Sequence, residues 1–206
     1  MPKKIIINTL KYLKEISIVM LGLTISFSIN TCINNRNDRR DISLYLQTID
    51  RAMDDVIRTV ENRLPISERA LELRTYLLMT ERDLWVQDKI SEFNEVIFSG
   101  TLTSFNLESF EMLLSSGMIR LISDIDLQMM IFNTKGIIET TNRSLEKSFD
   151  VKTPLLHEFI RTEDITPLLE HYRNNISNEL INILLKDVLS QAETLKQKLS
   201  ESRYMK

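Results

Sequence analysis

The sequence predicts an all-α protein, in which an N-terminal transmembrane helix continues into a helical bundle with long first and last helices. Three observations carry this prediction. The 206 residues include only four Gly and four Pro, which leaves little room for β-turns. Apolar residues recur at helical spacing along most of the chain. One stretch of eighteen residues carries no formal charge and lies between charged flanks.

Charge is distributed unevenly along the chain. The net charge is -3, but residues 1–15 hold four lysines against one glutamate, so the remainder is the acidic part. An acidic domain repels phosphate backbones, which argues against nucleic acid as a partner. Cys32 is the single cysteine, and it excludes an internal disulfide framework and a cysteine-based zinc site.

The uncharged stretch covers residues 16–33. As a helix it is about 27 Å long, close to the hydrocarbon thickness of a bilayer. Basic residues on both flanks only slightly favour a cytoplasmic N-terminus and an extracytoplasmic domain. Three alternatives stay open: a cleaved signal peptide, a lipoprotein signal with Cys32 lipidated, and a buried helix of a soluble protein. Gly22, with Ser26 one turn later, either permits close helix approach in the bilayer or faces lipid.

The helix is expected to run on from the span to about Arg63, with Pro65 as the next helix breaker. This stretch carries apolar residues at alternating spacings of four and three, a coiled-coil-like seam. The seam packs either on a second copy or partner protein, or on later helices of the same chain. Its residues are Ile42, Leu46, Ile49, Met53, Val56 and Val60.

The predicted organisation is a basic tail over 1–15, the span over 16–33, a juxtamembrane helix over 34–64 and a bundle over 65–203. Within the bundle, helices are expected at 66–79, 84–98, 105–116 and 123–149, followed by one unbroken helix over 167–202. The polar end of the last helix, from Gln191, is expected to fray. Predicted capping residues are Ser115, Ser116, Gly117, Ser123, Asp126 and Thr166.

The sequence lacks the residue patterns that are typical of catalysis or metal binding. A serine nucleophile needs a nearby base, and no G-x-S-x-G elbow surrounds Ser115 and Ser116. A di-iron site in a bundle uses Glu-x-x-His pairs, but Pro154 and Leu168 precede His157 and His171 by three residues. No catalytic residue, cofactor or metal ligand is therefore predicted. The aromatic residues Trp85 and Tyr172 are assigned to the core.

Two segments carry a family resemblance: Glu15, Ile16, Val19, Gly22, Ile25, Ile29 and Asn30 in the first, and residues 110–117, 121–124 and Leu127 in the second. With these residues the chain resembles the bacterial family known as domain of unknown function six thousand and ninety. The resemblance implies a single-pass protein of the bacterial inner membrane with a helical remainder, and it implies no reaction. The chain departs from the family pattern at Ser28 and Cys32, where the family has an amide and an aromatic residue.

Two functions follow as hypotheses. The first is a membrane-tethered interaction or scaffolding module, which binds a protein partner or forms a homo-oligomer through the span and the seam. The second is a ligand-sensing domain, in which the continuous helix passes a shift to the membrane. A hydrolytic enzyme is a distant third.

Overall fold

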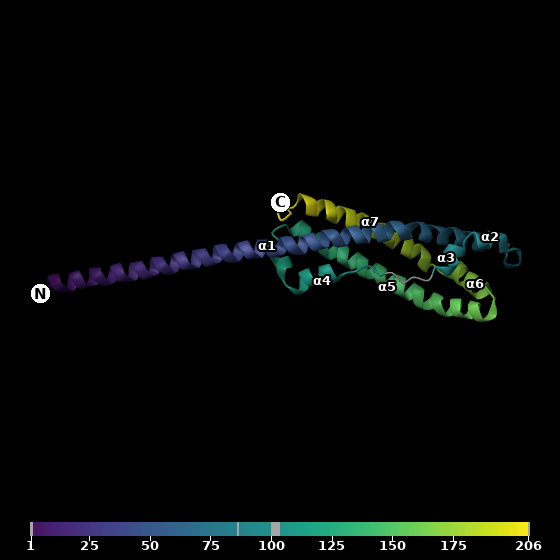
Figure 1. Cartoon of the computed structure of the whole chain (residues 1–206), viewed down its shortest axis with the longest axis horizontal. Coiled ribbons are helices and arrows are strands. Elements are labelled where there is room, and N and C mark those ends of the chain that lie inside the picture. The colour runs from purple at the N-terminus through teal and green to yellow at the C-terminus, as the bar shows by residue number, and fades with distance from the viewer. Residues whose placement is uncertain (1, 86, 100–103, 206) are drawn as a thin grey trace.

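The computed structural model describes residues 2–85, 87–99 and 104–205, without the side chains of residues 2–19, 22, 29–35 and 87. The protein is all-α: 86% of it is helical, and the described residues form no strand. Three long helices, α1 (Pro2–Met79), α5 (Ile125–Thr162) and α7 (Ser177–Glu201), build the bundle. Figure 1 shows α1 projecting far beyond the bundle, whereas α7 returns so that the C-terminus lies where α1 enters.

The first helix does not end at Pro65. Proline has no N–H to donate to the carbonyl of Glu61 and costs about 3 kcal/mol inside a helix, yet α1 continues to Met79. Buried residues lie on both sides of the proline, Val60 before it and Ala70 after it. Because packing holds both halves of the helix, tertiary contacts outweigh the local cost. Pro154 also lies inside a helix, α5, whose buried residues all precede it, while Leu155 and Leu156 directly after it are partly buried.

Short helices fill the spaces between the long ones. At the end of the bundle far from the N-terminus lie η1 (Arg82–Leu84), α2 (Gln87–Ser91), α3 (Asn94–Phe98) and α6 (Thr166–Asn174). At the near end lie α4 (Glu108–Ser115) and η2 (Met118–Leu121). The single helix predicted over 84–98 is therefore divided into short pieces, which turn their apolar residues into one cluster.

The predicted last helix is also divided. Asn175 adopts an extended conformation between α6 and α7, and its Oδ1 accepts a hydrogen bond of 2.8 Å from the Ser177 N–H. This break changes the helical register between α6 and α7, and Leu180 and Ile183 of α7 are exposed. The end of α7 packs instead of fraying, because Leu195 and Leu199 are fully buried.

Buried apolar residues form two clusters. We call the larger one the proximal core; it joins α1, α4, α5 and α7 and includes Ile42, Leu46, Ile49, Met53, Val56 and Val60. The smaller one, the distal core, joins the end of α1 with α2, α3 and α6. All six seam residues are at most 3% exposed. The seam therefore packs on later helices of the same chain, and pairing two copies through it would require opening this core.

The capping residues differ in part from those predicted. Gly117 adopts the left-handed conformation at φ 73°, after Ser115 and Ser116 bond back to carbonyls of α4. Asp124, and not Ser123, caps α5 by accepting from the Leu127 N–H, while Asp126 lies in the first turn. Ser123 is held instead by the Tyr204 and Arg203 side chains. Thr166 does not cap α6 either; its N–H donates to Asp164 Oδ1.

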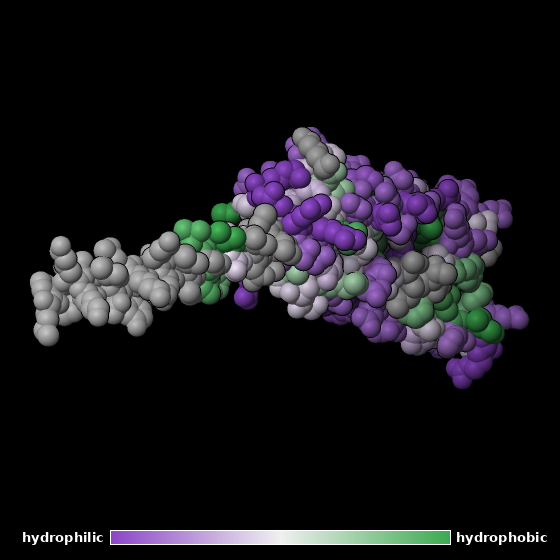
Figure 2. Space-filling view, turned by 60° about the vertical axis from the view of Figure 1, so that its left-hand side comes forward, coloured by the Kyte–Doolittle hydropathy of each residue, from purple (hydrophilic) through white to green (hydrophobic). Residues whose placement is uncertain are grey.

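The projecting part of α1 contains the predicted span. Within the described part of the chain, no helix has an apolar stretch of the length and hydropathy needed to cross a membrane. Of residues 16–33, the side chains of 16–19, 22 and 29–33 lie outside the description, and these include Gly22 and Cys32. The described side chains nearby, such as Met20, Leu21 and Phe27, are 62%, 64% and 68% exposed. Figure 2 shows a hydrophobic segment on the projecting part of the molecule, beside a mostly hydrophilic body.

Candidate functional site

A cavity of about 160 Å³ lies at the junction of the proximal and distal cores. Residues from α1, α3, α5, α6 and α7 line it, so every long helix contributes to its wall. Its apolar lining comes from both cores, and its polar lining includes two cations and no carboxylate. The 14 lining residues are Arg63, Ile66, Ser67, Ala70, Val96, Ser99, Leu145, Ser148, Phe149, Lys152, Tyr172, Asn178, Ile181 and Leu185.

Lys152 of α5 lies at one side of the cavity. Its ammonium donates to the carbonyls of Val96 and Ser99 at 2.9 and 2.8 Å, and lies 3.4 Å from Ser99 Oγ. Nζ also lies 5.4 Å from the centre of the Tyr172 ring. Burial lowers the pKa of Lys152 to about 8, because the charged form loses hydration. Carbonyl dipoles and a ring face therefore hold this cation without a countercharge in the lining.

Tyr172 of α6 fixes the same corner. Its hydroxyl donates to the Val96 carbonyl at 2.8 Å, so Tyr172 and Lys152 share one acceptor. Burial raises the pKa of Tyr172 well above its usual value. The neighbouring His171 packs edge-on against the Tyr172 ring, and both burial and the charge of Lys152 lower the pKa of His171. This environment therefore favours the neutral forms of Tyr172 and His171 next to the Lys152 ammonium.

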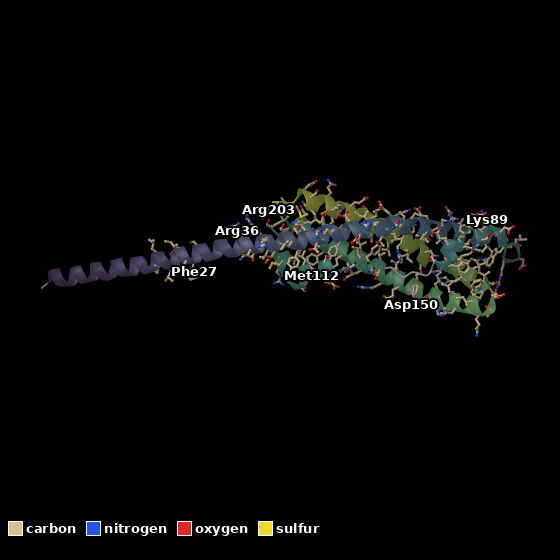
Figure 3. All side chains as sticks on the ribbon, viewed as in Figure 1. Phe27, Arg36, Lys89, Met112, Asp150 and Arg203 are labelled. Carbon is tan, nitrogen blue, oxygen red and sulfur yellow. The ribbon has the colours of Figure 1, made fainter. Side chains whose placement is uncertain are left out.

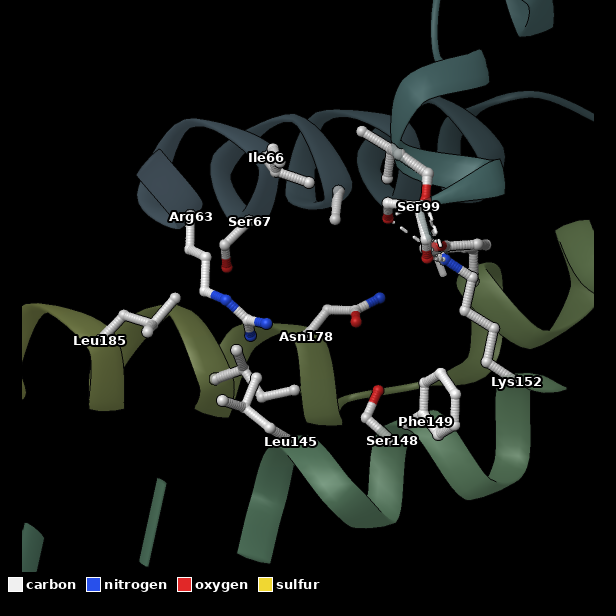
Figure 4. A pocket seen from close by; sticks show the side chains of 14 residues that line it. Arg63, Ile66, Ser67, Ser99, Leu145, Ser148, Phe149, Lys152, Asn178 and Leu185 are labelled. Carbon is white, nitrogen blue, oxygen red and sulfur yellow. Dashed lines mark hydrogen bonds between the residues drawn. The ribbon is translucent and has the colours of Figure 1, made fainter. Parts of the chain in front are cut away.

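Arg63 of α1 enters the cavity from the opposite side. Figure 4 shows Arg63 and Lys152 at opposite sides, with the Asn178 amide between them. Burial lowers the pKa of Arg63 from its usual high value, but a guanidinium stays charged at neutral pH. Asn178 Nδ2 is buried and has no hydrogen-bond partner among the described residues. An amide donor left without an acceptor in a buried position is costly, and it marks a place where an acceptor from a ligand would fit.

The sequence contains a signal for Arg63 and Ser67 that belongs to no catalytic or metal-binding motif. The seam spacing that ends at Val60 continues through residues 63, 67 and 70, so Arg63 and Ser67 occupy positions where an apolar residue is expected. Lys152 likewise follows Leu145 and Phe149 at helical spacing, on the inward face of α5. Polar residues on an otherwise apolar face are therefore the signal that could have located the cavity.

None of the residues predicted to act at a site lies in the cavity wall. Tyr172, which the sequence assigned to the core, does line the cavity. Trp85 is half-buried beside the distal core, where Nε1 donates to the Thr80 carbonyl at 3.2 Å. Within the described residues, no group of three or more His, Cys, Asp or Glu side chains is placed to hold a metal ion. The cavity pairs cationic and amide donors with apolar walls, an arrangement suited to binding an anion rather than to activating a nucleophile.

Comparisons with family models, curated proteins and solved structures gave no match. The resemblance to domain of unknown function six thousand and ninety therefore stays a prediction, and the geometry of the cavity carries the functional argument.

Proposed function

We propose that this chain is a membrane-anchored sensor domain, which binds a small molecule in the cavity and passes the resulting change along α1. One observation carries the proposal. The same uninterrupted helix presents Arg63 and Ser67 to the cavity and, farther toward the N-terminus, exposes apolar side chains around residues 20–28. A shift of α1 at the cavity would therefore reach the projecting segment without crossing a hinge loop.

The proposed anchor is the predicted span over residues 16–33, in a bacterial inner membrane with the bundle extracytoplasmic. Its described polar residues support this, because the hydroxyls of Thr24 and Ser28 donate to carbonyls one turn earlier at 2.8 Å. Such internal bonds make hydroxyl side chains tolerable in lipid. Figure 3 shows Phe27 on the projecting helix, beyond Arg36 at the entrance of the bundle. An apolar segment followed by charged residues fits a bilayer and its interface.

Transmission is tested by distance measurements on the full chain in lipid nanodiscs, with Cys32 replaced by serine. Spin labels are placed on Glu61→Cys of α1 and Glu146→Cys of α5, both exposed. A small molecule that raises the melting temperature of the wild type, but not of the cavity-filled variant Ser148→Phe, is then added. We expect a change of about 1–2 Å in the distance between the labels.

The matched control places both labels on α1, at Gln47→Cys and Glu61→Cys, where the distance should stay constant. A molecule that occupies the cavity but leaves the α1–α5 distance unchanged would refute transmission along α1.

Anchoring is tested by replacing exposed apolar residues of the projecting segment with lysine, in the double variant Leu23→Lys, Ile25→Lys. This variant should be released from membranes by an alkaline wash, because charged side chains are costly inside a bilayer. Leu44→Lys is the matched control, since Leu44 is an exposed leucine of α1 within the bundle. Retention of the double variant would count against the anchor.

Sidedness is tested separately with Ser200→Cys, an exposed position near the end of α7. In the Cys32→Ser background, an impermeant thiol reagent should label it in intact spheroplasts. Labelling only after lysis would place the bundle in the cytoplasm.

A second function, the interaction or scaffolding module, is favoured by a different surface. Ile125, Met129 and Phe132 are spaced four and three residues apart on α5 and are 71%, 55% and 45% exposed. An apolar stripe of this spacing is typical of a helix face that contacts another protein. Disulfide crosslinking of Met129→Cys in membranes should give a dimer or a partner adduct if this function holds. Glu146→Cys, farther along α5, serves as the control position.

A further inference from the structure

Both cations that line the cavity are already engaged. The Lys152 ammonium has three N–H donors, which face the carbonyls of Val96 and Ser99 and the Ser99 hydroxyl. Arg63 also takes part in an interaction of its own. These two residues therefore supply a positive potential, and direct contact with a ligand falls to another group. A positive potential favours an oxygen with a partial negative charge, whereas a full anion would lose its hydration without a salt-bridge partner to replace it.

Asn178 supplies the unused hydrogen-bond donor. Its Nδ2 is buried and has no hydrogen-bond partner among the described residues. Figure 4 shows the amide directed into the cavity from α7. Asn178 precedes Ile181 and Leu185 by one and two helical turns, so it stands on a face of α7 that is otherwise apolar. A buried amide donor on such a face is costly unless an acceptor from a bound molecule meets it.

Much of the remaining wall is hydrocarbon. Apolar side chains reach the cavity from α1 and α5, among them Ile66, Ala70, Leu145 and Phe149. The volume of about 160 Å³ is close to that of a cavity of roughly 150 Å³ that holds one benzene-sized molecule. The body of the ligand is therefore compact and apolar, with an acceptor at one end. A carbonyl oxygen supplies that acceptor without adding a donor that would need a partner of its own.

We propose that the cavity binds a small neutral carbonyl compound with a compact apolar body, whose oxygen accepts a hydrogen bond from Asn178 Nδ2. The inference rests on the proposed function, because it names the ligand class of the same cavity. The body of the ligand contacts α1 and α5, and its oxygen contacts α7. Occupancy of the cavity therefore connects the three long helices, as transmission along α1 requires.

The test compares acetophenone with α-methylstyrene, in which a methylene group replaces the carbonyl oxygen at nearly the same shape. The full chain in nanodiscs is titrated by calorimetry. Nanodiscs with the cavity-filled variant Ser148→Phe give the partition of each probe into lipid, which is subtracted. Acetophenone should bind about five- to tenfold more tightly than α-methylstyrene, because only its oxygen meets the Asn178 donor.

Substitution of the donor should remove this preference. Asn178→Leu has a similar volume and no amide, so the two probes should bind within about twofold of each other. Asn133→Leu, at an exposed position of α5, is the matched control and should keep the wild-type preference. A folded Asn178→Leu variant, judged by circular dichroism, that keeps the wild-type preference would overturn the proposal.

A direct measurement keeps the test decisive if Asn178→Leu fails to fold. Side-chain amide signals of asparagine are recorded by nuclear magnetic resonance on the wild type. The Asn178 signal is identified by its loss in Asn178→Asp, which has nearly the same shape. Its protons should shift downfield with acetophenone and not with α-methylstyrene. An unchanged signal at saturating acetophenone would overturn the hydrogen bond to Asn178.

The remaining outcomes separate this inference from the proposed function. α-Methylstyrene binding as tightly as acetophenone would overturn the carbonyl contact, and tighter binding of benzoate would overturn the neutral class. Both results would leave a small-molecule sensor in place. Absence of binding by every probe would overturn this ligand class, whereas the proposed function fails if the α1–α5 distance stays constant when another molecule occupies the cavity.

Discussion

The proximal and distal cores share the long helix α1 but differ in what packs against it: α4, α5 and α7 in the proximal core, and α2, α3 and α6 in the distal core. Of the described residues, twenty buried ones form the proximal core and ten the distal core. In the proximal core the seam of α1 is apolar at each position from Ile42 to Val60. At the junction with the distal core the seam turns polar at Arg63 and Ser67, and a cavity opens there. The comparison teaches that the proximal core is packed continuously with apolar side chains, whereas polar residues at the junction leave a cavity.

The largest expected effect is in the proximal core. Leu46→Ala removes a fully buried side chain from the seam and should lower the free energy of unfolding by ~2–5 kcal/mol. Urea denaturation of the full chain measures this loss. The neighbouring Leu44→Ala, at an exposed position of the same helix, should cost less than ~0.5 kcal/mol. Equal effects of the two variants would break the distinction between core and surface on α1.

The next effect concerns Lys152 and pH. Its pKa is about 8 in the folded protein and 10.5 in the unfolded chain, so between these values the unfolded state binds more protons. The free energy of unfolding should therefore rise as pH increases from 8 toward 10.5. Urea denaturation of the wild type and of Lys152→Met at pH 7 and pH 9.5 isolates this contribution. The wild type should gain stability relative to the variant at the higher pH, and no relative gain would contradict a buried charged ammonium at the junction.

A smaller effect is expected for Tyr172→Phe. The variant loses the 2.8 Å hydrogen bond to the Val96 carbonyl and should be less stable by about 1 kcal/mol. Since Lys152 donates to the same carbonyl, the double variant with Lys152→Met should deviate from additivity by at least ~0.5 kcal/mol. Additive losses of stability would show that the Tyr172 hydroxyl and the Lys152 ammonium contribute independently, although both donate to the Val96 carbonyl.

A helix cap of the proximal half gives a local comparison. Asp124→Ala removes the acceptor for the Leu127 N–H and should cost ~1 kcal/mol, whereas Ser123→Ala should leave the start of α5 intact. Hydrogen exchange over residues 125–129 measures fraying of that turn. The Leu127 N–H bond lowers the pKa of Asp124, so the stabilising contribution is present at neutral pH and lost as pH falls through that lowered pKa. Faster exchange in Ser123→Ala than in Asp124→Ala would reverse the assignment of the cap.

Several features of the fold could be predicted because they are local. Scarce glycine and proline with helical periodicity indicate an all-α chain, and the seam spacing marks the inward face of α1. Helix ends were less predictable at Pro65 and Pro154, because both helices continue through the proline and, at Pro65, buried residues on both sides hold the helix. At Asn175 a helix ends although no glycine or proline is present. The Asn175 side chain accepts a hydrogen bond from the Ser177 N–H, and the two resulting helices pack into different cores, α6 into the distal core and α7 into the proximal core.

The sequence by itself determined the helical class, the apolar seam and the uncharged stretch of residues 16–33, because each depends on the order of neighbouring side chains. Only the tertiary structure decided that the seam packs within the chain, and that Arg63, Lys152 and Asn178 meet around one cavity. These residues lie on three different helices, and no local pattern relates their positions. Their meeting depends on how α1, α5 and α7 fit together, which is a property of packing and not of periodicity.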